Sequence, residues 1–163
     1  MLLWVANLAG FEIHPWYSRC SATTKPDFLV IDLDPVPGVT FQKVRTAALH
    51  VRDALDAWAL PAFVKTSGAT GLHLFVPIQR GPNQEEVHDV ARDIASAIEA
   101  QFPRIFTTEY RIANRPKGRV LLDHNQNALG HHLAGAYVVR AKPTATVSTP
   151  VTWTELIKIA AEV

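Results

Sequence analysis

The order of apolar segments between residues 28 and 123 limits the folds open to this chain more than any other feature. Four short runs, partly β-branched and bounded by turn-forming or charged residues, have the length of strands. They lie at 28–34, 62–66, 72–78 and 120–123. Two longer stretches, which follow Thr40 and Asn83, repeat apolar residues at helical spacing. The predicted order is β-α-β-β-α-β, the split βαβ pattern of ferredoxin-like and RRM-like α+β folds.

Capping residues support both helices and the flanking sequence adds smaller elements. Thr40 suits an N-cap, and Asn83 with Glu86 has the pattern of a capping box. The faces expected to be buried carry Val44, Ala48, Val51, Leu55 and Trp58 in the first helix, and Val87, Val90, Ile94, Ile98 and Phe102 in the second. Outside the core we expect a helix at 1–9, short strands at 11–14 and 136–140, and a final helix around Leu156 and Ile159 capped by Thr152 and Glu155.

Length and composition predict a single globular domain over residues 1–163. The chain has 48% hydrophobic and 19% charged residues, and a net charge of +1 gives no global attraction to nucleic acid. Cys20 is the only cysteine, which excludes an intrachain disulfide and favours a reducing, cytoplasmic location. The apolar start, residues 1–11, lacks a basic n-region and is interrupted by Asn7 and Gly10, so neither a signal peptide nor a membrane span is expected.

Two carboxylates end the first strand of the predicted core. Because side chains alternate along a strand, Asp32 and Asp34 share one face while Leu33 points into the core. The βαββαβ topology can bring Asp123, at the end of another strand, beside them. Three clustered carboxylates suit Mg²⁺ or Mn²⁺, and such a site can hold two metals for phosphoryl transfer. The alternative is a set of solvated carboxylates at strand ends.

A glycine-containing turn, Ser67-Gly68-Ala69-Thr70-Gly71, joins two strands of the predicted core. Its backbone N–H groups and the Ser67 and Thr70 hydroxyls can approach an anion. His73 follows on the next strand, on the face opposite its apolar neighbours. The alternative is an ordinary hairpin turn with a half-exposed histidine, and Lys65 is predicted to be a solvated strand charge.

Basic residues gather in two places. Five lie in the loop before Asp123, at 104–119, and Arg140 and Lys142 follow the strand predicted at 136–140. A local excess of arginine in a nearly neutral chain favours a polyanionic partner, against the alternative of solvated loop charge. Three aromatic residues could stack bases or be buried, namely Trp16, Tyr17 and Trp153, and His131-His132 is predicted to be loop surface.

Six ordered motifs carry a resemblance to a known family. They are Leu-Trp-Val-Ala-Asn-Leu and Glu-Ile-His-Pro-Trp near the start, Asp-Leu-Asp-Pro at 32–35, Ser-Gly-Ala-Thr-Gly-Leu-His at 67–73, Leu-Asp-His-Asn-Gln-Asn at 122–127 and Ala-Thr-Val-Ser-Thr-Pro at 145–150. Together they resemble the polymerase domain of bacterial ATP-dependent DNA ligase D, which belongs to the archaeo-eukaryotic primase superfamily. The resemblance covers nearly the whole chain.

The resemblance implies metal-dependent nucleotidyl transfer to a 3′-hydroxyl in DNA end-joining repair, often with Mn²⁺ and ribonucleotides. It assigns metal binding and catalysis to Asp32, Asp34 and Asp123. It assigns the incoming nucleoside triphosphate to Ser67, Gly68, Thr70, Gly71, His73, Gln126 and Arg140. The implied partners are the triphosphate, DNA ends, and a DNA ligase or end-binding protein, with no membrane.

The chain departs from the family pattern in three ways. Thr70 stands where many members have lysine, His124 stands where an aromatic is common, and family domains carry a further segment before the first motif. Two alternatives therefore stay open: a non-catalytic module that binds single-stranded nucleic acid, as RRM-like sheets do, and an inactive remnant of the polymerase domain. The uncapped apolar run Leu2–Leu8 is expected to favour association with itself or a partner.

Overall fold

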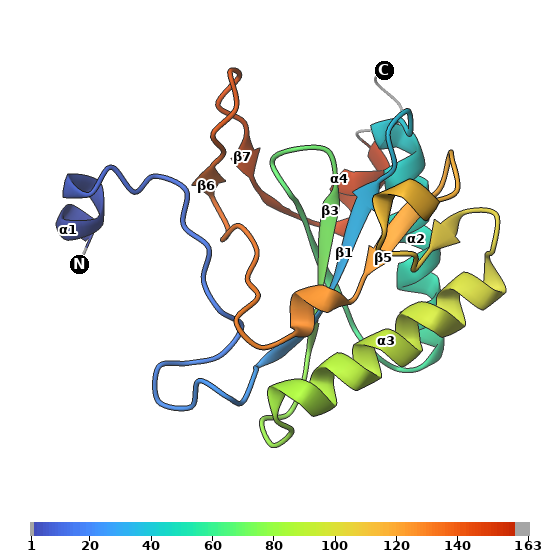
Figure 1. Cartoon of the computed structure of the whole chain (residues 1–163), viewed down its shortest axis with the longest axis horizontal. Coiled ribbons are helices and arrows are strands. Elements are labelled where there is room, and N and C mark those ends of the chain that lie inside the picture. The colour runs from blue at the N-terminus through green and yellow to red at the C-terminus, as the bar shows by residue number, and fades with distance from the viewer. Residues whose placement is uncertain (1, 159–163) are drawn as a thin grey trace.

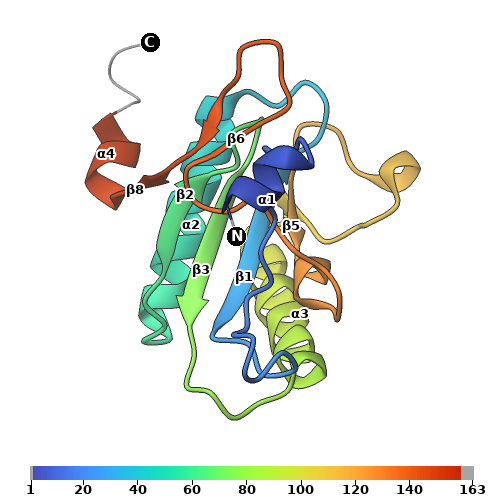
Figure 2. The same cartoon turned by 90° about the vertical axis from the view of Figure 1, so that its left-hand side faces the viewer.

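The computed structural model describes residues 2–158 and has one six-stranded mixed sheet with two long helices on one of its faces (Figures 1 and 2). The sheet order is β4-β5-β1-β3-β2-β8. The strands are β1 (Phe28–Pro35), β2 (Phe63–Thr66), β3 (Leu72–Pro77), β4 (Phe106–Thr107), β5 (Val120–Asp123) and β8 (Pro150–Val151). The long helices are α2 (Phe41–Ala57) and α3 (Gln84–Gln101).

The four central strands confirm the predicted topology. Their order, β5-β1-β3-β2, places β1 between β3 and β5, and every neighbouring pair within these four is antiparallel. Helix α2 follows β1 and leads past β3 to β2. Helix α3 follows β3 and leads past β1 to β4 and β5, as the split βαβ pattern requires. The two outer strands are short additions, because β4 pairs parallel with β5 and β8 pairs antiparallel with β2.

The main core lies between the sheet and the two helices. Leu29, Ile31 and Leu33 alternate along β1 toward this core, where they join the buried residues of α2 and α3. Both predicted caps are present: Thr40 accepts from the backbone N–H of Lys43, and Asn83 and Glu86 form a complete capping box. These caps satisfy backbone donors that would otherwise lack a partner at the helix starts.

Two residues expected on the buried helix faces are exposed instead. Trp58 is 44% exposed because α2 ends at Ala57, so this side chain lies at the C-cap rather than within the last turn. Val90 is 52% exposed because it lies at the margin of the apolar stripe, whose centre is formed by Ala91, Ile94 and Ile98.

The flanking elements match the prediction only in part. The N-terminal helix is α1 (Leu2–Asn7), which Figure 1 shows well apart from the sheet. No strand forms at 11–14, because this segment meets no partner strand and makes one backbone bond, from Gly135 N–H to the Ile13 carbonyl. The strand predicted at 136–140 shrinks to β6 (Val138–Val139), since Tyr137 has a positive φ of 61° and breaks the extended backbone.

The C-terminal part supplies a small ribbon and a short helix. β6 pairs with β7 (Val147–Ser148) outside the main sheet. The helix α4 (Trp153–Lys158) begins at the predicted cap, where Thr152 and Glu155 bond reciprocally. Leu156 is buried, whereas Ile159 lies outside the described residues. Among residues 2–158, no helix has both the length and the apolar character needed to cross a membrane.

Within residues 2–158, no long helix covers the second face of the sheet. Phe28, Val30 and Asp32 alternate along β1 toward this face, where Tyr17 and Leu133 from two loops partly cover it. Figure 2 shows α2 and α3 behind the sheet and the N-terminal segment in front of it. The polar side chains of the predicted site all belong to this second face or to the loops beside it.

Candidate active site

A row of four ionisable side chains crosses the second face of the sheet. Asp123 of β5 is paired in register with Asp32 of β1, Asp32 with His73 of β3, and His73 with Lys65 of β2. Residues paired across strands point to the same face, so the row is a direct result of the sheet order. The structure therefore brings Asp32 and Asp123 together across 91 positions of sequence, as the topology predicts.

The three carboxylates have different local partners. Asp123 is buried and accepts hydrogen bonds from the Asn125 N–H at 2.9 Å and from Gln126 Nε2 at 3.0 Å. Asp34 is half exposed and faces Arg115, with 3.7 Å between Oδ2 and Nη1. Within residues 2–158, no three His, Cys, Asp or Glu side chains converge closely enough to form a finished metal cage. The three carboxylates share a face, and each has its own local partners.

The charges of this cluster favour a cation. Burial, followed by the charges of Asp123 and Asp34, raises the pKa of Asp32 to about 8, against the opposing effect of Lys65 and Arg140. Burial also raises the pKa of Asp34. Carboxylates in this position gain stability when a divalent cation offsets their repulsion, and a donor set made only of oxygen is the one that Mg²⁺ and Mn²⁺ prefer.

The turn between β2 and β3 is organised by its own serine. Ser67 Oγ accepts from the backbone N–H groups of Ala69 at 3.1 Å and Gly71 at 3.0 Å, so these two donors are already engaged. Gly71 lies against the Leu33 carbonyl, and Gly68 has a φ of +70° and packs against Arg140 and Ser148. A side chain at either glycine would collide with these groups, so both glycines allow a close approach of neighbouring segments.

Arg140 is anchored beside this turn. Its Nε donates to Glu12 Oε1 at 2.9 Å, and its Nη1 donates to the Ser67 carbonyl. The Ala141 N–H donates to the other oxygen of Glu12 at 2.8 Å. That backbone bond, followed by a hydrogen bond with His14, holds the pKa of Glu12 at about 2. The N-terminal loop is thereby tied to the segment that carries Arg140.

A cavity of about 210 Å³ unites most of the predicted site residues. Its lining includes Asp32, Asp34, Ser67, Thr70, Gly71, His73, Gln126 and Arg140. Two predicted site residues do not line the cavity. Asp123 is buried and accepts a hydrogen bond from Gln126, and Gly68 packs against Arg140. The cavity is acidic on the β1 side and basic at Arg140, which suits a metal-bound polyanion.

Sequence reasoning missed several residues of this site. His14 and His132 line the cavity and their rings meet edge to face at 5.1 Å. His132 is exposed loop surface as predicted, but its place at the cavity was not expected. His14 lies within the Glu-Ile-His-Pro-Trp motif, which was the available signal. For His132 no local pattern indicated the contact, since a long loop carries it across the sheet.

Lys65 and His73 are both more buried than the alternatives of a solvated lysine and a half-exposed histidine. Lys65 is 5% exposed rather than solvated, and His73 is 3% exposed rather than half-exposed. Lys65 Nζ lies 2.8 Å from His73 Nδ1 and 2.5 Å from Ser148 Oγ. Burial, followed by the charges of Lys65 and Arg140, lowers the pKa of His73 to about 3, and burial lowers that of Lys65 to about 8. His73 is therefore neutral at neutral pH.

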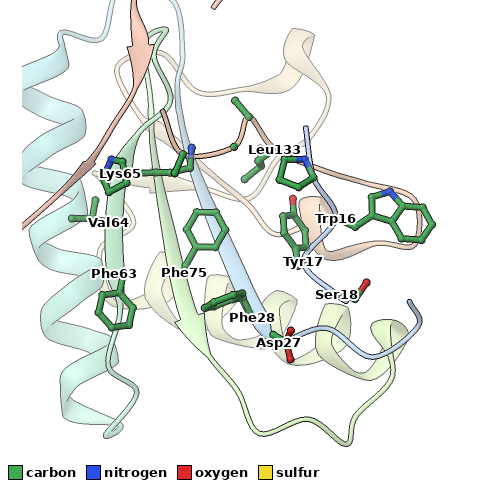
Figure 3. A pocket seen from close by; sticks show the side chains of 15 residues that line it. Trp16, Tyr17, Ser18, Asp27, Phe28, Phe63, Val64, Lys65, Phe75 and Leu133 are labelled. Atoms are coloured by element: carbon green, nitrogen blue, oxygen red, sulfur yellow. The ribbon is translucent and has the colours of Figure 1, made fainter. Parts of the chain in front are cut away.

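An apolar pocket of about 480 Å³ adjoins the row on the same face of the sheet. Figure 3 shows Phe28 and Phe75 on the strands, Tyr17 on the facing loop, and Lys65 at the pocket's edge. Tyr17 is buried rather than available for stacking, and Trp16 is 44% exposed. Trp153 is a structural residue, because its Nε1 donates to the Ala62 carbonyl and its ring packs against the main core.

The basic loop before β5 is partly committed to its own structure. Arg115 donates to the carbonyls of Glu109 at 3.1 Å and Tyr110 at 2.9 Å, which shapes the loop around a short 3₁₀ turn at Ile112–Asn114. A second 3₁₀ turn, Asn125–Asn127, follows Asp123 and carries Gln126 toward the cavity. In that turn the Asn127 side chain exchanges hydrogen bonds with the Val30 backbone and fixes the turn against β1.

Comparison with known proteins places this chain in a defined family. Residues 1–162 match the family model described as the LigD primase-polymerase domain. The LigD of Pseudomonas aeruginosa, a multifunctional non-homologous end joining protein, is 34% identical over 95% of this chain, and that of Mycolicibacterium smegmatis is 32% identical over 95%. The matched part is 18% and 20% of these two relatives, so the chain spans about a fifth of their length.

A solved structure shares the same fold. The polymerase domain of Mycobacterium tuberculosis ligase D, determined in complex with DNA, superimposes with a TM-score of 0.86 at 30% sequence identity. The match covers 98% of this chain and 58% of that one. The α+β fold and the match along residues 1–162 together show that the chain belongs to the LigD primase-polymerase domain family.

Proposed function

We propose that this chain is a metal-dependent nucleotidyltransferase that adds nucleotides, ribonucleotides included, to the 3′-hydroxyl of DNA ends during end-joining repair. The observation that carries the proposal is the row of Asp123, Asp32 and His73 beside a cavity that Arg140 also lines. This arrangement pairs oxygen ligands for cations with donors for phosphate, which are the two requirements of phosphoryl transfer.

The proposed metal ligands are Asp32, Asp34 and Asp123, with Mn²⁺ or Mg²⁺ in a two-metal site. Their fit rests on the all-oxygen donor set and on the burial and mutual repulsion that raise the pKa of Asp32. When bound, the metals supply neutralisation of the triphosphate charge and a lower pKa for the attacking hydroxyl.

The remaining residues would bind and orient the triphosphate. Neutral His73 and the amide of Gln126 are hydrogen-bond donors in the cavity, and Arg140 adds a fixed positive charge. Ser67 shapes the turn, and Thr70 contributes a hydroxyl at its tip. In the proposed reaction the primer 3′-oxygen bonds to the α-phosphorus, the bond from α-phosphorus to the bridging oxygen breaks, and pyrophosphate leaves.

The proposed partners are nucleoside triphosphates, DNA ends, and a DNA ligase or end-binding protein. Support comes from the relatives, which are end-joining proteins, and from the neighbouring structure, which contains DNA. DNA affinity is expected to be steeply salt-dependent, because contacts from Arg and Lys to phosphate release counterions.

A second candidate is a non-catalytic module that binds single strands. Phe28, Phe63 and Phe75 line the apolar pocket on the sheet face, and Phe63 is 65% exposed, which resembles the stacking surface of RNA-binding sheets. The carboxylates of Asp32, Asp34 and Asp123 lie on the same face and repel phosphate when no metal offsets their charge. Metal dependence of nucleotide binding therefore separates the two candidates.

Calorimetric titration of a non-hydrolysable nucleoside triphosphate, with Mn²⁺ or with a chelator, tests the proposal. We expect binding with Mn²⁺ and none with the chelator. Asp32→Asn should abolish the metal-dependent part, while Asp53→Asn, which changes an exposed carboxylate of α2 bonded to Arg52, should leave it intact. Equal binding by the wild-type protein and Asp32→Asn would contradict the metal assignment.

A further inference from the structure

Lys65 occupies an unusual position for a lysine. Its side chain is buried at the end of the ionisable row, next to the apolar pocket, where Nζ also lies 5.9 Å from the centre of the Phe75 ring (Figure 3). A buried ammonium is costly unless its donors are satisfied. The two short contacts of Nζ, to His73 and Ser148, therefore indicate a specific role within the site.

The direction of each hydrogen bond in this group is fixed by its neighbours. Ser148 Oγ lies 2.8 Å from the Thr66 carbonyl, which can only accept, so the serine hydroxyl donates there. Ser148 Oγ must then accept from Lys65. An ammonium has three donors and no acceptor, so His73 Nδ1 must accept from Lys65 as well.

An imidazole whose Nδ1 accepts carries its proton on Nε2 when it is neutral. Nε2 is the nitrogen that faces Asp32, at 3.6 Å from Oδ1, and both residues line the 210 Å³ cavity. The tautomer of His73 therefore decides whether the cavity meets an N–H donor or a lone pair. Only the donor form suits a phosphate oxygen.

We propose that Lys65, seated on Ser148, is a positioning residue that locks His73 in the Nε2–H tautomer and so presents an N–H donor to the triphosphate cavity. The use of that donor for triphosphate rests on the proposed function, whereas the lock itself does not. The inference also gives a role to the Ala-Thr-Val-Ser-Thr-Pro motif, because Ser148 and Thr149 of this segment bond to Thr66 at the end of β2.

The wild-type protein gives the first test. Two-bond ¹H–¹⁵N correlation spectra of protein labelled at histidine nitrogen distinguish the two neutral tautomers and the imidazolium, and His73→Gln assigns the signal. We expect His73 as the Nε2–H tautomer without metal or nucleotide at pH 7. A neutral Nδ1–H form or an imidazolium would overturn the inference without any variant of Lys65.

Lys65→Met gives the second test, because methionine keeps the length and apolar stem of lysine and removes the donors. We expect the His73 signal to change to a mixture of tautomers and the Mn²⁺-dependent affinity for a non-hydrolysable triphosphate to fall roughly 10-fold. The matched control is Lys43→Met, which removes an exposed lysine of α2 and should change neither value. An unchanged His73 tautomer in Lys65→Met would overturn the inference.

The two readouts also separate this inference from the proposed function. His73 in the Nε2–H form, disturbed by Lys65→Met, supports the lock even in a protein that binds no triphosphate. That combination would overturn the proposed function alone. Normal triphosphate binding with His73 in the Nδ1–H form would overturn the lock alone.

Discussion

At the scale of single residues, the most informative feature is the unequal environment of three aspartates. Asp123 receives two hydrogen bonds, Asp34 faces Arg115, and Asp32 lies between the other carboxylates and His73. The negative charge of Asp32 is therefore the least favourable of the three. Burial, followed by the charges of Asp123 and Asp34, raises its pKa to about 8. Such a residue is expected to lower the stability of the metal-free protein, and in the proposed function its carboxylate binds a cation.

The raised pKa of Asp32 predicts an unusual pH dependence of stability without metal. The folded state holds a proton on this carboxyl that the unfolded state releases near its ordinary pKa, so stability should fall as pH rises from about 4 to about 8. Asp32→Asn should remove this slope and raise Tm at pH 8.5 by about 2–4 °C. Calorimetric melts in chelator at several pH values check this, with Asp53→Asn as control. A slope unaffected by Asp32→Asn would contradict the description of the cluster.

His73 carries a second prediction at this scale. If its N–H donates to phosphate, His73→Ala should weaken Mn²⁺-dependent triphosphate binding by about 1–3 kcal/mol. His88→Ala serves as a control, because His88 lies on α3 and contacts Asn125 rather than the cavity. Titration calorimetry measures both, and equal affinities of His73→Ala and wild type would leave His73 without the proposed contact.

At the scale of elements, the turn between β2 and β3 shows why a short loop needs two glycines. Gly68 is in a left-handed conformation, and a Cβ there would lie 2.7 Å from Arg140 Cγ and 2.8 Å from the Ser148 nitrogen. The turn, Arg140 and β7 thus form one unit that depends on the absence of a side chain. The β6–β7 ribbon holds no part of the main core, and its contact with the turn positions Arg140 instead.

Gly68→Ala should therefore be more damaging than its backbone conformation alone explains. Gly38→Ala is the matched control, since Gly38 has a φ of +90° and no atom within 4 Å of the added Cβ. We expect Gly38→Ala to cost about 1 kcal/mol and Gly68→Ala about 1–3 kcal/mol more, from strain plus collision. Urea unfolding measures both. Equal losses in the two variants would show that the packing around Gly68 is looser than described.

Sequence reasoning succeeded where local signals agree with the global topology. Strand and helix order, the caps at Thr40 and Asn83, and the meeting of Asp32 with Asp123 all follow from periodicity and one connectivity rule. It failed where a tertiary contact decides the outcome. Lys65 appeared solvated because nothing in its own strand shows that Ser148 covers it, and His14 and His132 meet through loops that carry no periodic pattern.

At the scale of the whole molecule, one face of the sheet is closed by helices and the other is open in places. On the open face, the row of ionisable side chains adjoins the apolar pocket of about 480 Å³. The start of the chain adds further apolar surface, with Leu3 88% and Trp4 67% exposed. Exposed apolar side chains grouped in this way are typical of surfaces that contact another protein or another copy.

The isolated chain is therefore expected to associate through its N-terminal segment. Sedimentation velocity should show concentration-dependent association, and Leu3→Glu with Trp4→Glu should reduce it without loss of Mn²⁺-dependent triphosphate binding. As a control, Ile112→Glu places one such charge on an exposed apolar residue of the basic loop and should leave association unchanged. A wild-type protein that stays monomeric throughout the concentration series would contradict this prediction.

We propose that Asp32, Asp34 and Asp123 support metal-dependent nucleotidyl transfer. Extension of a labelled, 5′-phosphorylated DNA end tests this proposal most directly. In low salt with Mn²⁺ and ribonucleoside triphosphates, the wild-type chain and Asp53→Asn are predicted to add nucleotides at similar rates. Asp32→Asn and Asp123→Asn are predicted to lose activity by at least about 100-fold. Thermal melts of the same samples check that both variants are folded. Equal extension by Asp32→Asn, or no extension by the wild-type chain that binds triphosphate and DNA, would contradict the claim.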